Sequence, residues 1–279
     1  MIDDPQTVTV MQIAPAVRVT LGEEFGLTAG ENVEERLVYA LKHIGVDYVM
    51  DTNFAADVVI MEEGTELLER LKARKENKES ALPMFTSCCP GWVNYVEKHA
   101  PMIMEYLSTT RSPQAVFGAL AKVLLPHKLN VARENLRVIS VMPCTAKKGE
   151  AIRPTLNREE GPDVDAVLTV RELSKLLRRC GMHLKNCKPM ARDQHLFTDY
   201  SGAGAIFGTT GGVMEAALRT VADLLNGTSS DAIDYVQVRG IEDGIKIAEV
   251  EILDLKIRAA VAHGLGNARK LIERVKAGE

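Results

Sequence analysis

The chain has 279 residues, a mass of 30.6 kDa and a formal net charge of −4, with a pI near 5.9. A chain of this length can bury a substantial core, either as one large domain or as two packed lobes. Its composition, 46% hydrophobic and 26% charged, is that of an ordinary soluble globular protein. The small negative charge gives no electrostatic reason to expect nucleic acid or an anionic membrane as a partner.

The N-terminal residues and the cysteine count indicate a cellular compartment. Met1-Ile2-Asp3-Asp4-Pro5 is acidic where a signal peptide is basic and then apolar. No apolar run approaches the length that spans a bilayer. Five cysteines, an odd number in a chain of this length, do not suggest the disulfide framework of a secreted protein. We therefore expect a cytoplasmic protein with reduced thiols.

Short apolar runs alternate with longer amphipathic runs, a pattern that predicts an α/β fold with mainly parallel strands. The expected strands cover residues 7–13, 47–50, 138–142, 166–170, 235–239 and 246–252. The expected helices cover residues 31–43, 55–73, 171–179 and 263–276, together with a helix that follows the glycine-rich segment 202–212 and ends near 225. Residues 83–85 should be extended, and Asp243-Gly244 should form a hairpin turn between the last two strands.

Two adjacent cysteines are the most informative local feature of the chain. Cys88 and Cys89 lie in the segment Phe85-Thr86-Ser87-Cys88-Cys89-Pro90-Gly91-Trp92. Neighbouring cysteines seldom pair with each other because the small ring strains the disulfide, so two different roles are expected, one thiol bound and one reactive. A ligand cysteine followed by proline is typical of iron–sulfur segments. The alternative is that the two cysteines are buried as small apolar side chains. The segment favours a chemical role for the thiols over this structural one.

Other polar side chains suit chemistry but also have structural interpretations. Cys144 and Cys89 both follow expected strands, where ligand sites of parallel sheets lie, and Lys147 could stabilise a thiolate or bind an anion. Taken alone, Cys144 is better interpreted as a buried strand-end residue. Glu63 and Glu66 share one helix face and could relay protons if buried, although such faces are usually only solvated.

The remaining cysteines, histidines and glycines show no site pattern. Cys180 and Cys187 lack a tight ligand spacing and are expected to be structural, and the six histidines show no metal-binding spacing. No P-loop lysine follows Gly208–Gly212, and Thr209-Thr210 interrupt a dinucleotide-binding pattern. A tight turn into a helix is therefore expected there, and a nucleotide site is not.

Two long motifs resemble the first two signature motifs of the iron-only (FeFe) hydrogenases. They are Thr86-Ser87-Cys88-Cys89-Pro90-Gly91-Trp92 and Met142-Pro143-Cys144-Thr145-Ala146-Lys147-Lys148-Gly149-Glu150, in the order and at the separation that the family shows. Further support comes from Glu62-Glu63-Gly64-Thr65-Glu66, Ser108, Ser112-Pro113-Gln114 and Phe207-Gly208-Thr209-Thr210-Gly211-Gly212-Val213-Met214-Glu215. The likeness runs from Ala14-Pro15 to about Leu271.

The resemblance implies a fold and a cofactor. Residues 1–279 would form an H-cluster domain with an α/β fold of two lobes, mainly parallel sheet flanked by helices, and the cluster site between the lobes. The H-cluster of this family is a 4Fe–4S cluster joined to a diiron subcluster that carries CO, CN and a bridging dithiolate.

The resemblance also implies roles for individual residues. Cys89 and Cys144 correspond to two of the four thiolates that hold the 4Fe–4S cluster, and Cys88 corresponds to the thiol that gives and takes the proton. The proton path from that thiol to the surface corresponds to Glu63, Ser108, Glu66 and Arg70. Lys147 corresponds to the lysine that binds a cyanide of the diiron unit. The pocket wall corresponds to Pro15, Ser112, Pro113, Gln114, Met142 and Phe207.

The sequence departs from the family pattern in two places. The family's third motif, a Met-Ala-Cys-x-x-Gly-Cys segment, supplies the other two thiolates, and the sequence ends at Gly278-Glu279 before such a segment would begin. The ligand set is therefore expected to be incomplete at the C-terminal end, and this chain alone is expected to have no H₂ activity. No ferredoxin-type cysteine run precedes the domain, so no accessory relay cluster is expected.

Two functions of different classes follow from the resemblance. The first is a hydrogenase catalytic domain that reversibly interconverts H₂ with protons and electrons, with ferredoxin or an iron–sulfur subunit as electron partner and with maturation proteins that install the cluster. The second is a non-catalytic hydrogenase-like protein for iron–sulfur assembly, sensing or scaffolding. Cys88, Lys147 and the Glu63/Glu66 pair favour the first function, and the missing third motif favours the second.

Overall fold

The computed structural model describes residues 1–193, 197, 199–226, 244–253 and 255–278. The chain divides into two compact units, each made of two separate stretches of sequence. The first unit comprises residues 1–55 and 111–200, and the second comprises residues 56–110 and 201–279.

The first unit is built on a parallel sheet with the strand order β2-β1-β3-β4. The strands are β1 (Val8–Ile13), β2 (Tyr48–Asp51), β3 (Leu136–Met142) and β4 (Ala166–Thr169). All neighbouring strands pair in parallel, and Ile13 lies beside both Asp51 and Val141. β1 and β3 are buried almost throughout, as expected of central strands with helices on both faces.

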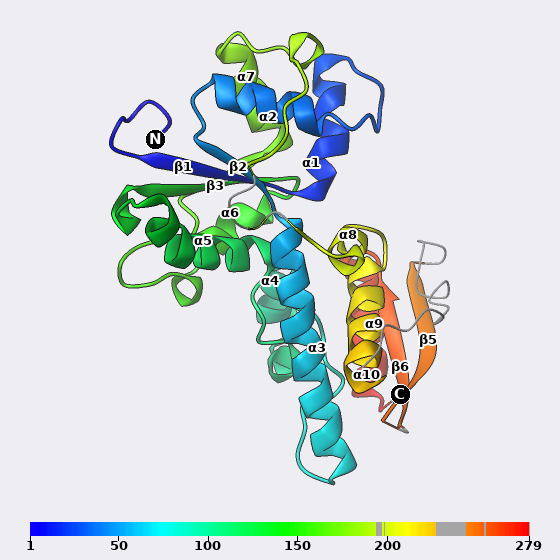
Figure 1. The fold of residues 1–279 in the computed structure, drawn as a ribbon. Helices are drawn as coiled ribbons and strands as arrows, with labels where there is room; N and C mark the ends of the chain where they lie inside the picture. The colour runs from blue at the N-terminus through cyan, green and yellow to red at the C-terminus, as the bar shows by residue number, and fades with distance from the viewer. Residues whose placement is uncertain (194–196, 198, 227–243, 254, 279) are drawn as a thin grey trace. The chain divides into compact units, whose positions relative to one another are not determined.

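Helices cover both faces of this sheet (Figure 1). One face carries α1 (Pro15–Thr20), α2 (Glu34–His43) and α7 (Val170–Arg179), and the other carries α5 (Pro113–Leu129) and α6 (Ala146–Ala151). Each face buries its own apolar cluster, the first around Leu37, Leu41, Leu173 and Leu177 and the second around Phe117, Leu125 and Val138. Short 3-10 helices cover Leu21–Phe25, Arg133–Asn135, Pro154–Leu156 and Leu184–Asn186.

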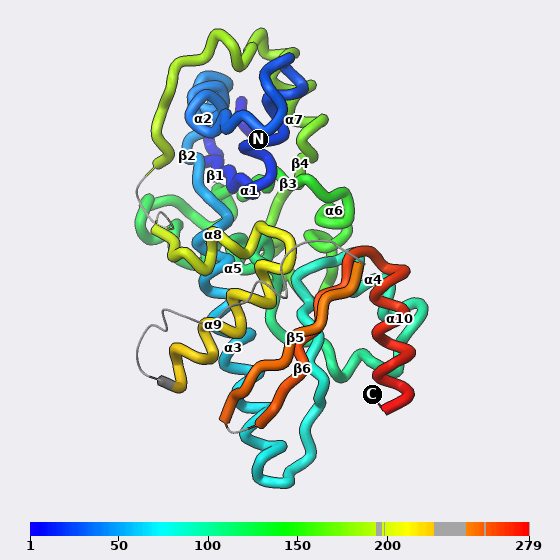
Figure 2. The backbone as a smooth tube through the Cα atoms, turned by 90° about the vertical axis from the view of Figure 1, so that its right-hand side faces the viewer, coloured from blue at the N-terminus to red at the C-terminus, as the bar shows by residue number. Residues whose placement is uncertain are grey.

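The second unit is mainly helical and contains one described hairpin. α3 (Asn53–Lys75) supplies its longest helix, followed by α4 (Pro90–His99), the 3-10 helix η2 (Pro101–Tyr106), α8 (Gly202–Phe207), α9 (Gly212–Asn226) and α10 (Leu265–Lys276). The antiparallel strands β5 (Ile245–Ile252) and β6 (Leu255–Ala262) lie side by side (Figure 2). Leu68 and Leu71 of α3 pack with Val221 of α9 and Ala259 of β6.

The expected α/β fold, with a parallel sheet flanked by helices, is confirmed, and the strands expected at 7–13, 47–50, 138–142 and 166–170 form that sheet. The parallel sheet belongs to the first unit, whereas the described strands of the second unit are antiparallel because a tight connection joins them directly. Residues 83–85 form no strand: Phe85 makes an isolated parallel bridge to Leu107. Cys89 therefore does not follow a strand, but Cys144 does.

The strand expected at 246–252 is present as β5. It pairs with β6, which the sequence did not predict, and Leu253 after β5 has a left-handed backbone with φ of +54°. The expected strand 235–239 and Asp243 lie outside the described residues. The glycine-rich segment 202–212 contains the helix α8 before the expected helix α9 begins.

Candidate active site

The site residues of the first unit gather at the carboxyl edge of the parallel sheet. Pro15 begins α1 just after β1, Met142 ends β3, and Cys144 follows two residues later. The Ala14 N–H donates to the carbonyl oxygen of Val141 at 3.1 Å, which holds the ends of the two strands together. Ligand sites of open parallel sheets lie at this edge.

α5 begins at the same edge and presents three further predicted residues. Ser112 is its N-cap, with Oγ accepting from the N–H of Ala115 at 3.4 Å, and Pro113 stands at its first position. Gln114 follows, and its carbonyl oxygen accepts from Nε2 of Gln12 on β1 at 3.1 Å. All three predicted residues are buried.

A buried polar network connects these residues. Gln12 Nε2 also donates to Ser140 Oγ at 2.8 Å, and Ser112 Oγ donates to Glu150 Oε2 at 2.9 Å. Gln114 Nε2 donates to the same Glu150 oxygen at 3.1 Å, and Lys147 Nζ does so at 2.9 Å. Gln114 Oε1 is buried, and no donor among the described residues lies within hydrogen-bond distance of it.

The site residues of the second unit form a chain of side chains along α3. The bridge between Phe85 and Leu107, with the N–H of Ser108 donating to the Phe85 carbonyl at 2.7 Å, brings the cysteine segment beside Ser108. The Ser87 N–H donates to Glu63 Oε1 at 3.5 Å, and the Ser108 hydroxyl also hydrogen-bonds Glu63. Ser108 Oγ donates to Glu66 Oε2 at 2.8 Å.

Arg70 is the last side chain of this hydrogen-bonded series. Its Nη2 donates to Glu66 Oε1 at 2.6 Å and to the carbonyl of Leu107 at 2.9 Å, and its Nη1 donates to the carbonyls of Ala81 and Tyr106. The Arg70 and Glu66 side chains are 13% and 16% exposed, whereas Glu63 is 1% exposed. This series of side chains therefore runs from the fully buried carboxyl group of Glu63 to the Glu66–Arg70 ion pair, which is in partial contact with solvent.

The protonation of Glu63 is set by its surroundings. Burial raises the pKa of Glu63 to about 7, and the neighbouring Glu66 carboxylate acts in the same direction. The Ser87 N–H and the Ser108 hydroxyl oppose the rise because they stabilise the ionised form. A carboxyl group with a pKa near neutrality can both take and give a proton at physiological pH.

The two adjacent cysteines differ in environment. Cys89 is exposed and is the N-cap of α4, with Pro90 at the first helical position, while Cys88 is only partly exposed. Neither is in a disulfide. A Cβ placed on Gly91 would meet only the Cys89 sulfur within 4 Å, at 3.8 Å, among the described residues. There is thus open space beside this sulfur.

Phe207 is the last residue of α8 and is half-buried. The sharp connection from α8 to α9 depends on Gly212, because a Cβ there would lie 1.7 Å from the carbonyl oxygen of Ile206. This close approach gives Gly212 a structural role in the turn from α8 to α9. Cys187 is buried and Cys180 exposed, and neither lies at the sheet edge.

The thiols fit part of the ligand set of an iron–sulfur cluster. A cubane normally has four thiolate ligands. Cys89 and Cys144 are accessible thiols outside any disulfide. At the sheet edge the buried acceptor Gln114 Oε1 has no hydrogen-bond donor among the described residues, so a bound group could supply one. Over the part of the chain that the structure describes, no three His, Cys, Asp or Glu side chains gather as a metal site, so these residues supply a partial set only.

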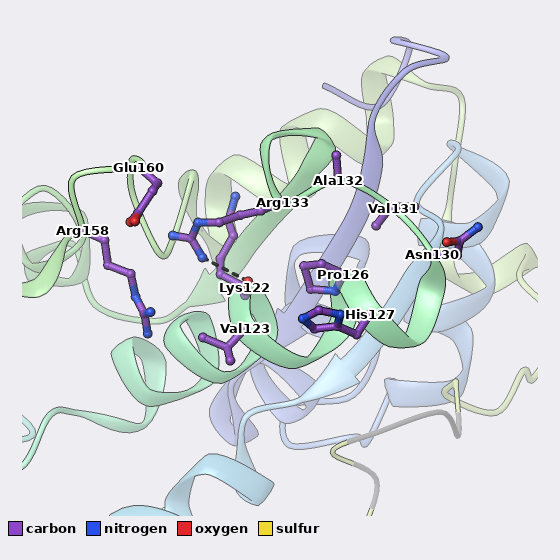
Figure 3. A pocket seen from close by; sticks show the side chains of 10 residues that line it. All are labelled: Lys122, Val123, Pro126, His127, Asn130, Val131, Ala132, Arg133, Arg158 and Glu160. Carbon is purple, nitrogen blue, oxygen red and sulfur yellow. Dashed lines mark hydrogen bonds between the residues drawn. The ribbon is translucent and has the colours of Figure 1, made fainter.

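A cavity of about 720 Å³ lies at the opposite end of β3 and contains none of the predicted residues (Figure 3). Its lining includes Lys122, whose Nζ donates to the carbonyl of Leu136 at the start of β3, and Arg133, which donates to the Lys122 carbonyl at 3.0 Å. The cavity is therefore not part of the candidate site.

Sequence reasoning placed no function on Gln12 or Glu150. Gln12 is a polar residue between the apolar residues Met11 and Ile13 of a buried strand. A buried polar side chain at such a position is a sequence feature that points to a specific role. Glu150 was noted only as the end of a motif. No helix in the described parts of the chain is long and apolar enough to cross a membrane.

Comparison with known proteins identifies the chain's relatives. It is 46% identical to the NADP-reducing hydrogenase subunit HndD of Solidesulfovibrio fructosivorans, over 99% of this chain and 47% of that protein. It is 41% identical to iron hydrogenase 1 of Clostridium pasteurianum, over 96% of this chain and 46% of that protein. The chain thus spans about half the length of these curated relatives. A more distant relative is the cytosolic Fe-S cluster assembly factor narfl of Danio rerio, at 32% identity over 98% of this chain and 67% of that protein.

The fold is also similar to solved structures. A variant of the FeFe-hydrogenase HydA1 from Chlamydomonas reinhardtii superposes with a TM-score of 0.86 at 38% identity, over 99% of this chain and 76% of that chain. The family model described as "Iron only hydrogenase large subunit, C-terminal domain" matches residues 7–279. The chain therefore belongs to the iron-only hydrogenase family, as a C-terminal domain of the large subunit.

Proposed function

We propose that this chain provides the catalytic domain of an FeFe hydrogenase, which interconverts H₂ with protons and electrons at an H-cluster. The observation that carries the proposal is the buried chain Glu63–Ser108–Glu66–Arg70 beside the cysteine pair. A protein that only held a cluster would have no need for a buried carboxyl group with a pKa near 7, whereas proton turnover requires one.

Cys89 and Cys144 would hold the 4Fe–4S part of the H-cluster, with two further thiolates completing the set. When bound, the cluster supplies the electrons and the metal at which H₂ is split or formed. Lys147 would place its ammonium toward a cyanide of the diiron unit, a charge-assisted contact. Pro15, Ser112, Pro113, Gln114, Met142 and Phe207 would wall the pocket and exclude water.

The protein residues would move the proton. Cys88 passes it between the cluster pocket and Glu63. Glu63 holds it for part of the time near neutral pH, because its pKa is raised to about 7. The Ser108 hydroxyl, which contacts both carboxyl groups, passes it to Glu66, and the ion pair of Glu66 with Arg70 delivers it toward solvent.

The electrons would come from ferredoxin or an iron–sulfur electron-transfer subunit. Maturation proteins would install the diiron unit. A reducing compartment such as the cytoplasm suits the unpaired state of all five cysteines in the structure.

The proposal is tested on the protein in a form that carries all four thiolates, after anaerobic maturation. We expect infrared bands from CO and CN ligands together with H₂ evolution, and we expect Cys89→Ala and Cys144→Ala each to abolish both. Cys180→Ala is the matched control, because that thiol is exposed and lies outside the site. A matured protein without these bands would contradict the proposal.

The second candidate function is a hydrogenase-like protein for iron–sulfur assembly or scaffolding. The likeness to the assembly factor narfl over nearly the whole chain favours it. It predicts a protein that binds 4Fe–4S clusters and shows the corresponding visible absorption, but never the CO and CN bands. The same infrared measurement therefore separates the two functions.

A further inference from the structure

We propose that Glu150 is a positioning residue that holds Lys147 and Gln114 in the orientations in which they face the cluster pocket. The proposal rests on the proposed function and goes one step further. In this role Glu150 does not itself touch the cluster but orients Lys147 and the pocket-wall residue Gln114.

The carboxylate of Glu150 collects three donors on one oxygen. Oε2 accepts from Lys147 Nζ at 2.9 Å, from Ser112 Oγ at 2.9 Å and from Gln114 Nε2 at 3.1 Å. Glu150 is 5% exposed, so these donors replace water as its solvation. The donors come from two helices, α5 and α6, and Glu150 therefore fixes the start of α5 against the segment that follows Cys144.

The contact with Glu150 orients the Lys147 side chain. A lysine side chain has four rotatable bonds and about 2 kcal/mol of rotamer entropy to lose when it is fixed. The Lys147 side chain is only 14% exposed, and the Glu150 carboxylate lies three residues further along the same helix. One of its N–H groups is committed to Glu150, which holds the ammonium in one place.

Gln114 is oriented by the same oxygen. Its Nε2 donates both to Glu150 Oε2 and to the carbonyl oxygen of Lys147, at 3.1 Å each. Both N–H groups are thereby used, and the amide cannot turn over without losing them. Oε1 is left as the buried acceptor that no described residue satisfies, and a buried acceptor of this kind favours a donor on a bound molecule.

A plain structural role for Glu150 would affect stability alone. A positioning role predicts in addition that removing its charge changes the behaviour of Lys147 before any cluster is bound, and changes the cluster environment afterwards. Glu150→Gln tests both, because the amide keeps the side-chain volume but loses the charge. It also places a donor where Gln114 Nε2 already donates.

The first measurement uses the protein without its diiron unit. Amine acylation with mass-spectrometric readout should show Lys147 labelled severalfold faster in Glu150→Gln than in wild type. Glu273→Gln is the matched control, because Glu273 pairs with Lys276 at the same three-residue spacing but on the surface, with 60% exposure. It should leave the labelling of Lys147 unchanged. Equal labelling of Lys147 in wild type and Glu150→Gln would overturn the proposal.

The second measurement uses the matured protein. Glu150→Gln should shift the cyanide stretching bands and lower the H₂ turnover by about 10–100-fold, the usual cost of losing an outer-shell partner. Lys147→Gln combined with Glu150→Gln should cost less than the sum of the two single losses, because part of the effect of Glu150 passes through Lys147. Additive losses would overturn the proposal. A wild type without cyanide bands would instead reject the proposed function, whatever the labelling shows.

If Glu150→Gln fails to fold, Glu150→Asp replaces it. The shorter carboxylate keeps the charge but withdraws it from the three donors. Faster labelling of Lys147 in a folded Glu150→Asp supports the positioning role, and unchanged labelling contradicts it.

Discussion

Glu63 shows how one buried side chain connects stability with function. Its carboxyl group is 1% exposed and has a pKa of about 7, mainly because burial disfavours the ionised form. Natural proteins seldom bury such a group without a reason, since its ionisation at neutral pH costs folding free energy. The proposed proton relay would account for the burial of Glu63, and the folding free energy that its ionisation costs can be measured.

The folded state holds the Glu63 proton more tightly than the unfolded chain does, because its pKa is about 7 rather than the ordinary 4.5. Its contribution to stability is therefore fully present below pH 4.5 and is lost as the pH rises to 7. The difference between these two pKa values corresponds to about 3 kcal/mol of folding free energy. Chemical denaturation between pH 4.5 and pH 8 should show that Glu63→Gln gains stability relative to wild type by this order of magnitude as the pH rises.

Glu62→Gln is the matched control for this prediction, because Glu62 is the preceding residue of α3 and is exposed. Its unfolding free energy should follow the wild-type pH dependence. A Glu63→Gln variant with the same pH dependence as wild type would show that Glu63 is ionised throughout this range.

The sequence singles out candidate residues where a long motif carries them. Cys88, Cys89 and Cys144 were singled out from neighbouring residues, and the Glu63/Glu66 pair from helical spacing, but spacing alone could not show that Glu63 is buried. That burial comes from the packing of α3 with the segments at 85–87 and 106–108, which no local pattern reveals. Gln12 was missed because its partners Gln114 and Ser140 lie 102 and 128 residues away in sequence. Two of the three partners of Glu150 lie 38 and 36 residues away, so its role was not visible locally either.

At the scale of elements, the parallel strands, β5 and the helices α2, α3, α7, α9 and α10 were predicted within a few residues. The helices α4 and α5, the strand β6 and the short helices α1, α6 and α8 were missed, and α5 is the longest of these. Eight of its residues are buried, among them Gln114 and Lys122, so no polar face interrupts its apolar pattern. Its start signal, the N-cap Ser112 followed by Pro113, was present in the sequence. The β5–β6 hairpin was not predicted, because Leu253, which adopts a left-handed conformation after β5, is not a typical turn residue.

Gly118 allows α5 to pack closely against the segment before β4. A Cβ at this position would lie 2.6 Å from Val164 Cγ2 and 2.8 Å from the carbonyl oxygen of Asp163. The backbone contact cannot relax by a side-chain rotation, so we expect Gly118→Ala to lower the unfolding free energy by about 1–3 kcal/mol. Thermal or chemical denaturation of the purified protein measures this directly.

Gly149 on α6 is the matched control for Gly118, because a Cβ there meets nothing within 4 Å in the described structure. Gly149→Ala should leave stability unchanged or raise it by up to about 1 kcal/mol, as expected for alanine in a helix. If both variants were equally stable, the close approach at Gly118 would not be a constraint.

At the scale of the whole molecule, each of the two units carries its own part of the predicted site. The first unit places Cys144, Lys147 and five of the predicted wall residues at the carboxyl edge of a parallel sheet, and the second contains the cysteine pair and the hydrogen-bonded Glu63–Ser108–Glu66–Arg70 series. The chemistry of the first group suits an anionic cluster, and that of the second suits proton transfer. The two signature motifs, more than 50 residues apart in sequence, thus belong to different units.

The central claim is that Cys88 and the Glu63 chain carry protons to and from a cluster held by Cys89 and Cys144. The most direct test compares H₂ evolution with infrared spectra for Cys88→Ala in the matured protein that carries all four thiolates. We predict that the CO and CN bands persist while the rate falls by at least about 100-fold, the contribution of a proton-transfer group. A Cys88→Ala protein with intact bands and wild-type turnover would contradict the account.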